Sequence, residues 1–231
     1  MGLTSAQEDA LKALFHLEEH ADTPVTTSVL AESLGKAAPT VTNTLDTLET
    51  EGLVEREPYE GAELTPSGEL VAIEVLRHHR LLETFLMEQL DYPWEAVHAE
   101  AEALEHHISE EFEARIADTL GDPVVDPHGD PIPDADLEVP RTDHSGTLAE
   151  CEPGETITIT RVTRQEKADL AYLAERGINP GTTGRIVERA PFGMITLIVD
   201  DQRQSVPQEI AEAIYVRHGD AGRTATAAQE G

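Results

Sequence analysis

The sequence contains a single cysteine, Cys151, and few basic residues, with 16 Lys and Arg against 46 Asp and Glu in 231 residues. One cysteine excludes a disulfide within the chain and a zinc site built from cysteines, which fits a reducing compartment. No apolar run approaches the ~20 residues that a membrane-spanning helix needs, and no signal-peptide pattern opens the sequence. We therefore expect a cytoplasmic protein with no membrane partner, in which Cys151 is a small apolar residue and not a ligand.

The shortage of basic residues gives a formal net charge of -30. Such a balance normally argues against nucleic acid as a partner, because DNA is itself densely negative. Here the acidic residues are spread through every segment and lysine is scarce throughout, a pattern that resembles proteins of extreme halophiles. At ~1 M ionic strength the Debye length is only ~3 Å, so long-range repulsion from DNA is nearly abolished. The charge therefore indicates a halophilic habitat and leaves DNA open as a partner.

A group of histidine and glutamate residues lies on a helix predicted from Pro93 to about Leu120. Residues three or four apart in a helix share a face. Glu102, Glu105 and His106 follow His98 by four, seven and eight positions, so their side chains can converge.

The preceding predicted helix, from Pro66 to about Leu90, carries a second pair, His79 and Glu83, four residues apart. If the two helices pack antiparallel, imidazoles and carboxylates meet between them, which is a ligand set for a divalent transition metal. A solvated acidic face with incidental histidines is the alternative. Two pairs on successive helices favour the metal site.

A winged helix-turn-helix is predicted for residues 1–73. Ser5 and Glu8 have the spacing of a capping box at the start of the first helix, and a tight turn precedes the third helix. Short uncharged side chains at the start of the third helix suit contacts with bases. Residues 1–76 nevertheless contain three bases against fifteen acids. The expected elements are helices at 5–19, 25–34 and 40–51 and strands at 53–56 and 62–64.

The remaining chain predicts a change of structure after the helices. Residues 74–125 are expected to form a helical dimerisation and metal-binding domain, and residues 126–147, rich in Pro, Asp and Gly, a loose linker without a core. An apolar period of two then predicts a small SH3-like barrel at 148–217, with a short helix at 165–176. Residues 218–231 are expected to be a disordered tail. The fold class is therefore α+β.

With these elements in place, the sequence resembles the diphtheria-toxin-repressor family of metal-dependent transcriptional regulators. The resemblance covers about residues 4–217. It implies a homodimer that binds a palindromic operator in double-stranded DNA, and a C-terminal SH3-like (FeoA-like) domain. It is carried by Ala37-Ala-Pro-Thr-Val-Thr-Asn43 with Gly52-Leu-Val, by His79-Arg-Leu-Leu-Glu83, and by Val97-His98 with Glu105-His106.

The resemblance also implies site residues. The primary regulatory site would use Asp9, Glu102, Glu105 and His106. The ancillary site would use His79, Glu83 and His98 together with Glu166 and Asp169 of the barrel. The implied DNA-contact residues are Lys36, Ala37, Pro39, Thr40, Thr42 and Asn43.

The metal implied by this resemblance is Mn(II) or Fe(II). Iron-sensing members carry Met and Cys where this sequence has Asp9 and Glu102, and hard carboxylate oxygens favour Mn(II) over softer metals. Lys12 stands where manganese-sensing members carry a second acidic ligand. We therefore expect two separate sites per subunit and not a binuclear manganese site.

The expected function is metal-activated regulation, with repression of metal-uptake genes. Metal bound between the N-terminal helix and the dimerisation helices would stabilise the DNA-binding arrangement. A metal-loaded adaptor that acts through protein partners is the alternative. An enzyme is disfavoured, because Glu95-x-x-His98 is only half of a di-iron motif and the second half is missing.

Overall fold

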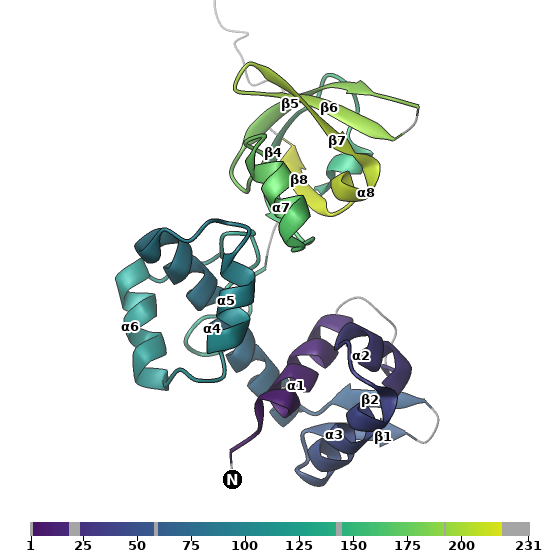
Figure 1. The fold of residues 1–231 in the computed structure, drawn as a ribbon, viewed down its shortest axis with the longest axis vertical. Helices are drawn as coiled ribbons and strands as arrows, with labels where there is room; N and C mark the ends of the chain where they lie inside the picture. The colour runs from purple at the N-terminus through teal and green to yellow at the C-terminus, as the bar shows by residue number, and fades with distance from the viewer. Residues whose placement is uncertain (1, 19–23, 58–59, 142–144, 192, 219–231) are drawn as a thin grey trace, which may run out of the picture. The chain divides into compact units, whose positions relative to one another are not determined.

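The computed structural model describes residues 2–18, 24–57, 60–141, 145–191 and 193–218. The chain forms two compact units, and Figure 1 labels their helices and strands. The first unit comprises residues 1–85, 99–124 and 132–140, and the second comprises residues 86–98, 125–131 and 141–231. Nearly all of the predicted tail lies outside the described residues.

The first unit begins with the predicted winged helix-turn-helix. Its hydrophobic core gathers apolar side chains from all three helices and from the hairpin, including Leu11, Leu30, Leu45 and Val54. The two strands pair antiparallel, with Val54 opposite Leu64. The elements are α1 (Ser5–Glu18), α2 (Thr27–Ser33), α3 (Ala38–Thr50), β1 (Val54–Glu57) and β2 (Gly61–Leu64).

Helix α1 is capped differently from the prediction. The backbone nitrogen and the hydroxyl of Thr4 both donate to the Gln7 side-chain oxygen, at 2.8 Å each. Thr4 and Gln7 have the capping-box spacing that had been assigned to Ser5 and Glu8. Glu8 is therefore available for another contact.

The two long helices expected after the hairpin are three in the structure. Helix α4 (Pro66–Leu90) has the predicted length, but the next helix is divided into α5 (Val97–Leu104) and α6 (Glu110–Leu120). The Ser109 hydroxyl accepts a hydrogen bond from the Phe112 nitrogen and starts α6 anew. The single helix predicted to Leu120 is thus wrong, because residues 105–107 form a turn and helix α6 begins only after Ser109.

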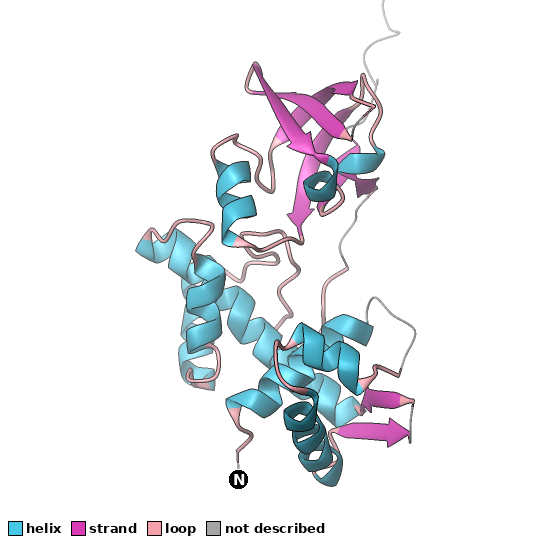
Figure 2. Cartoon of the chain, turned by 45° about the vertical axis from the view of Figure 1, so that its right-hand side comes forward, coloured by secondary structure: helices cyan, strands magenta, loops and turns pink. Residues whose placement is uncertain are grey.

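The second unit contains the predicted small β domain (Figure 2). Its six strands follow the order β3-β8-β4-β5-β6-β7, all antiparallel where they pair. Short helices α7 (Lys167–Ala174) and α8 (Gln208–Ala211) and the 3-10 helix η1 (Leu148–Glu150) complete it. The strands are β3 (Gly146–Thr147), β4 (Thr156–Val162), β5 (Thr183–Arg189), β6 (Met194–Val199), β7 (Gln202–Pro207) and β8 (Ile214–His218).

The segment expected to be a loose linker contains a structured loop. Asp126, His128 and Asp130 are buried, and the Asp126 carboxylate accepts hydrogen bonds from the backbone nitrogens of the other two, at 2.8 and 2.9 Å. The Val162 nitrogen on β4 donates to the His128 carbonyl at 2.8 Å. Composition predicted a loop correctly, but it missed that aspartate side chains can satisfy a buried loop backbone.

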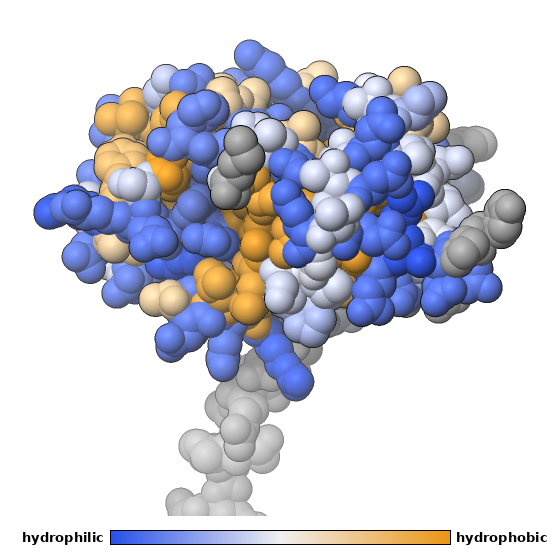
Figure 3. Space-filling view, turned by 90° about the horizontal axis from the view of Figure 1, so that it is seen from below, coloured by the Kyte–Doolittle hydropathy of each residue, from blue (hydrophilic) through white to orange (hydrophobic). Residues whose placement is uncertain are grey.

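The face seen in Figure 3 is mostly hydrophilic, with apolar patches between the polar side chains. Leu70 on α4 and Phe112 on α6 are about half exposed in the first unit. Among the described residues, no helix is both long and apolar enough to cross a membrane.

Candidate metal centre

The candidate metal centre of the first unit lies where α1 meets the turn after α5. His106, in that turn, is held between two carboxylates of α1. Its Nδ1 lies 2.6 Å from Glu8 Oε2, and its Nε2 lies 2.8 Å from Asp9 Oδ1. Both contacts are hydrogen bonds only when the imidazole carries two protons, so a metal at Nε2 would replace the proton that faces Asp9.

Glu105 lies next to His106 and is buried, with 1% of its surface exposed. One carboxylate oxygen pairs with the Lys12 ammonium of α1 and lies 3.3 Å from His106 Nε2. The other lies 2.5 Å from His79 Nδ1 on α4. Asp9, Glu105 and His106 each offer a ligand atom, and these three atoms lie within 4.8 Å of one another.

The charged groups of this centre change one another's pKa. Burial by itself raises the pKa of the Glu105 carboxyl. His79 and Lys12 lower it by more than burial raises it, so the net pKa is lowered and the carboxylate form is favoured. Burial by itself lowers the pKa of His79, and the carboxylates of Glu83 and Glu105 outweigh this effect, so the pKa is raised. The centre therefore attracts positive charge, and the Lys12 ammonium supplies one such charge at Glu105.

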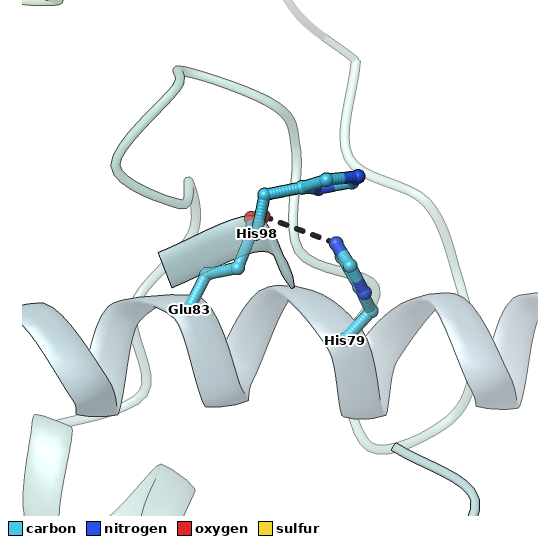
Figure 4. Close-up of side chains that lie close together, drawn as sticks. All are labelled: His79, Glu83 and His98. Atoms are coloured by element: carbon cyan, nitrogen blue, oxygen red, sulfur yellow. Dashed lines mark hydrogen bonds and ion pairs between the residues drawn. The ribbon is translucent and has the colours of Figure 1, made fainter. Parts of the chain in front are cut away.

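The predicted pair on α4 is also formed. His79 Nε2 lies 3.0 Å from Glu83 Oε1, one helical turn away, and both residues are buried (Figure 4). Figure 4 also draws His98, the second residue of α5. His98 itself belongs to the second unit. Its participation with the α4 pair stays a prediction.

Glu102 is not one of the three residues whose ligand atoms lie together, and its part in the centre stays a prediction. It lies on α5 and is exposed, whereas Glu105 and His106 lie beyond the end of that helix. The helical spacing that linked the three residues in the sequence therefore does not apply after Leu104. Glu8 was not predicted as part of the centre, although its position on α1 beside Asp9 is visible in the sequence. Lys12 was expected at the position of a second acidic ligand, and in the structure it pairs with Glu105.

The second unit holds the barrel residues of the predicted ancillary site. His98 and Glu166 line the same shallow groove, together with Arg164. The Arg164 guanidinium pairs with Asp169 and lies 3.3 Å from Glu166 Oε2. Glu166 and Asp169 are thus brought together as predicted, but around an arginine, which would have to move before both could bind a metal.

The predicted DNA-contact residues surround the N-terminus of α3. Lys36, Ala37, Pro39, Thr40 and Asn43 are exposed, and Thr42 is half-buried, its hydroxyl donating to the Ala38 carbonyl at 3.0 Å. The first turns of α3 carry no charged residue. The acids of this helix lie in its second half, where Arg56 pairs with Asp46 and lies 3.9 Å from Glu49.

Three family models together match most of the chain. Residues 2–62 match an iron dependent repressor N-terminal DNA-binding domain, residues 65–134 an iron dependent repressor metal-binding and dimerisation domain, and residues 146–218 a FeoA domain. The chain belongs to the iron-dependent repressor family. Members of this family are metal-dependent transcriptional repressors. The three matched domains and the observed elements confirm the predicted winged helix-turn-helix, dimerisation helices and SH3-like domain.

Known repressors resemble the chain over nearly its whole length. The iron-dependent repressor IdeR of Mycobacterium tuberculosis is 33% identical over 226 residues, covering 93% of this chain and 97% of the relative. The diphtheria toxin repressor of Corynebacterium diphtheriae is 31% identical over 223 residues, with the same coverage. These comparisons support a DNA-binding repressor and give no support to the adaptor.

Solved structures of manganese regulators are also similar. A manganese-dependent transcriptional repressor in complex with manganese has a TM-score of 0.82 and 38% identity, covering 92% of this chain and 99% of the other. The manganese regulator SloR has a TM-score of 0.73 and 31% identity, covering 94% and 100%. Iron and manganese therefore both occur among the relatives of this repressor.

The donor set of the centre fits either metal. One imidazole nitrogen and two carboxylates are ligands for Mn(II) and Fe(II), and cysteine is missing from the group. Glu8 at His106 Nδ1 supplies the carboxylate that commonly orients a metal-binding histidine.

Proposed function

We propose that this repressor binds operator DNA as a homodimer when Mn(II) or Fe(II) is held by Asp9, Glu105 and His106, and that it represses metal-uptake genes. The observation that carries the proposal is the placement of His106 and Glu105 directly against Glu8, Asp9 and Lys12 of α1. A divalent cation bound there would supply the positive charge that these carboxylates lack.

Helix α1 connects this centre to the recognition surface. Leu11 and Leu14 of α1 lie in the same buried cluster as Leu45 and Leu48 of α3. The Leu64 nitrogen of the wing donates to Glu18 Oε1 at 2.8 Å. Fixing Asp9 against Glu105 and His106 would therefore fix α3 and the wing as one body.

The link through α1 would let metal binding stabilise the arrangement of the two DNA-binding segments in which the dimer binds its operator. Two recognition helices of a dimer must lie about one DNA turn apart, ~34 Å or a multiple. By linkage, DNA must strengthen metal binding by the same factor by which metal strengthens DNA binding.

We further propose that Lys12 limits the centre to one divalent ion. Its ammonium already pairs with Glu105, the carboxylate that a second ion in this centre would need. Oxygen-rich ligands favour Mn(II), and the same set also accepts Fe(II). A second Mn(II) or Fe(II) ion of the subunit would then belong to the ancillary residues His79, Glu83 and His98, with Glu166 and Asp169.

Selection from a random DNA pool tests this function. The selection is run in ~1 M KCl with Mn(II), with Fe(II) under anaerobic conditions, and with a chelator. We expect an inverted repeat to be enriched only with metal, and the His106→Ala variant to lose it. His107→Ala is the matched control, because His107 is the exposed neighbour of His106.

Two results would contradict the proposal. Equal enrichment with the chelator would remove the metal requirement. Enrichment by His106→Ala at the wild-type level would place the regulatory metal elsewhere.

A further inference from the structure

A second group of metal-binding side chains lies in the barrel, outside both predicted sites. Cys151 follows η1, Glu155 immediately precedes β4, and His218 ends β8. Sγ of Cys151, a carboxylate oxygen of Glu155 and a ring nitrogen of His218 lie within 4.8 Å of one another. No sequence pattern connects these residues, since 67 positions separate Cys151 from His218.

The sheet itself holds the three residues in place. β4 and β8 pair antiparallel, with His218 opposite Ile157, two residues after Glu155. Glu155 Oε2 accepts a hydrogen bond from the Glu152 nitrogen at 2.9 Å and lies 3.8 Å from His218 Nδ1. The Cys151 thiol faces the Thr147 carbonyl at 3.5 Å. Little rearrangement is needed to bring three donors to one ion.

We propose that Cys151, Glu155 and His218 form a thiolate-containing site for a borderline divalent metal such as Zn(II). Zn(II) combines sulfur, nitrogen and oxygen ligands in tetrahedral sites, and three protein ligands leave its fourth position for water. Cys151 then acts as a ligand and not only as a small apolar residue. This sulfur-containing site of the barrel then differs in chemistry from the oxygen-rich centre at α1 and from the ancillary residues.

The surroundings of Cys151 favour a cation that bonds strongly to sulfur. Burial and the neighbouring carboxylates of Glu155, Glu150 and Glu152 raise the pKa of the Cys151 thiol to about 11, against a smaller opposing effect of Arg189. The neighbouring carboxylates attract a cation, and a sulfur ligand bonds more strongly to a borderline ion such as Zn(II) than to a hard ion such as Mn(II). The barrel site therefore discriminates against the metal that the first centre favours.

Cobalt(II) spectroscopy tests this site, because Cys151 is the one cysteine of the whole chain. A thiolate-to-cobalt charge-transfer band in the reduced, full-length protein can arise from no other residue. We expect this band, and we expect stoichiometric Zn(II) to abolish it while excess Mn(II) leaves it. His218→Ala, at an exposed strand end, and Glu155→Gln should weaken the band strongly, and Cys151→Ser should remove it.

Two controls keep the test specific. Asp9→Ala should retain the band, because Asp9 belongs to the other centre. Glu175→Gln should also retain it, because Glu175 is an exposed acid of the same domain. The proposal is overturned if the wild type gives no band with excess Co(II). It is also overturned if the band survives unchanged in both His218→Ala and Glu155→Gln, because the thiol would then bind cobalt without the other two residues.

Discussion

Lys12 of α1 and Glu105 of the turn after α5 form a partly buried ion pair that joins the DNA-binding segment to the dimerisation segment. The same Glu105 carboxylate reaches His79 on α4. Three segments are therefore linked through one acid without any divalent ion. A metal ion that binds at this centre therefore strengthens contacts between segments that Glu105 already links. Lys12 neutralises one carboxylate of the centre, so it reduces the negative charge that a metal ion would neutralise.

Replacing Lys12 tests the number of ions at the centre. Lys12→Glu removes the resident cation and adds a carboxylate, so we expect the centre to hold two Mn(II) ions and to show an exchange-coupled electron paramagnetic resonance signal. The wild type should show only uncoupled Mn(II). Lys12→Gln is the control, since it removes the charge without adding a ligand. A coupled signal in the wild type would show that Lys12 does not limit the centre to one ion.

Replacing Glu8 tests its role in orienting His106. Glu8→Gln should weaken Mn(II) binding by ~10–100-fold, the usual cost of losing a carboxylate behind a ligating histidine. Free Mn(II) measured by magnetic resonance gives this affinity directly. Glu32→Gln, on the exposed side of α2, should change nothing. An unchanged affinity in Glu8→Gln would mean that the His106–Glu8 contact has no part in metal binding.

The sequence predicted the elements well where local signals were strong. Thr65-Pro66 and the regular spacing of apolar residues define α4 from its first to its last residue. The centre was predicted less completely. Asp9, Glu105 and His106 are brought together, but the reason is the turn after Leu104 and not the helical face that the spacing suggested.

Other parts of the fold depended on contacts that periodicity does not encode. Strand β7 is almost entirely polar, so no alternation of apolar residues indicates it. It forms because Asp200 and Asp201 both adopt positive φ, the geometry of a two-residue hairpin turn that Asn-Gly more often provides. Likewise, Lys12 and Glu105 are 93 positions apart, and only the tertiary fold reveals that they form a pair.

The stability of the helical segment should depend on pH through Glu113. Burial by itself raises the pKa of Glu113, but His78 and Arg77 lower it more. The stability that ionised Glu113 contributes is therefore present above its ordinary pKa of 4.5 and is lost as the pH falls through its lower pKa in the folded state. Burial lowers the pKa of His78, yet Glu113 raises it more. The stability that protonated His78 contributes is therefore present below its ordinary pKa of 6.5 and is lost as the pH rises through its higher pKa in the folded state. The pair should therefore stabilise the fold most between these values.

Urea unfolding of Glu113→Gln in the presence of a chelator measures this effect. The variant should lose roughly 1–3 kcal/mol of unfolding free energy near pH 5.5, less at about pH 3 and less at about pH 9. Glu111→Gln is the matched control, because its exposed pair with Arg115 should contribute little at any pH. A loss in Glu113→Gln that is the same at all three pH values would contradict the ionic explanation.

Operator binding should depend weakly on salt, because few bases are available to contact phosphates. Of the three bases in residues 1–76, Lys12 pairs with Glu105 and Arg56 with Asp46, which leaves the exposed Lys36 before α3. One phosphate contact per subunit gives a slope of log K against log salt of about −2 for the dimer, where basic repressors reach about −10. Binding would then persist in molar KCl.

The remaining affinity must come from base contacts at the uncharged start of α3. Asn43→Ala should cost about 1–3 kcal/mol on the selected operator and relax the preference at one base pair of each half-site, because asparagine can form two hydrogen bonds with adenine. Lys36→Ala should instead weaken all sequences equally and flatten the salt slope. Fluorescence anisotropy with Mn(II) over a series of KCl concentrations separates the two effects. A steep wild-type slope, or an unchanged base preference in Asn43→Ala, would show that α3 does not read the operator in this way.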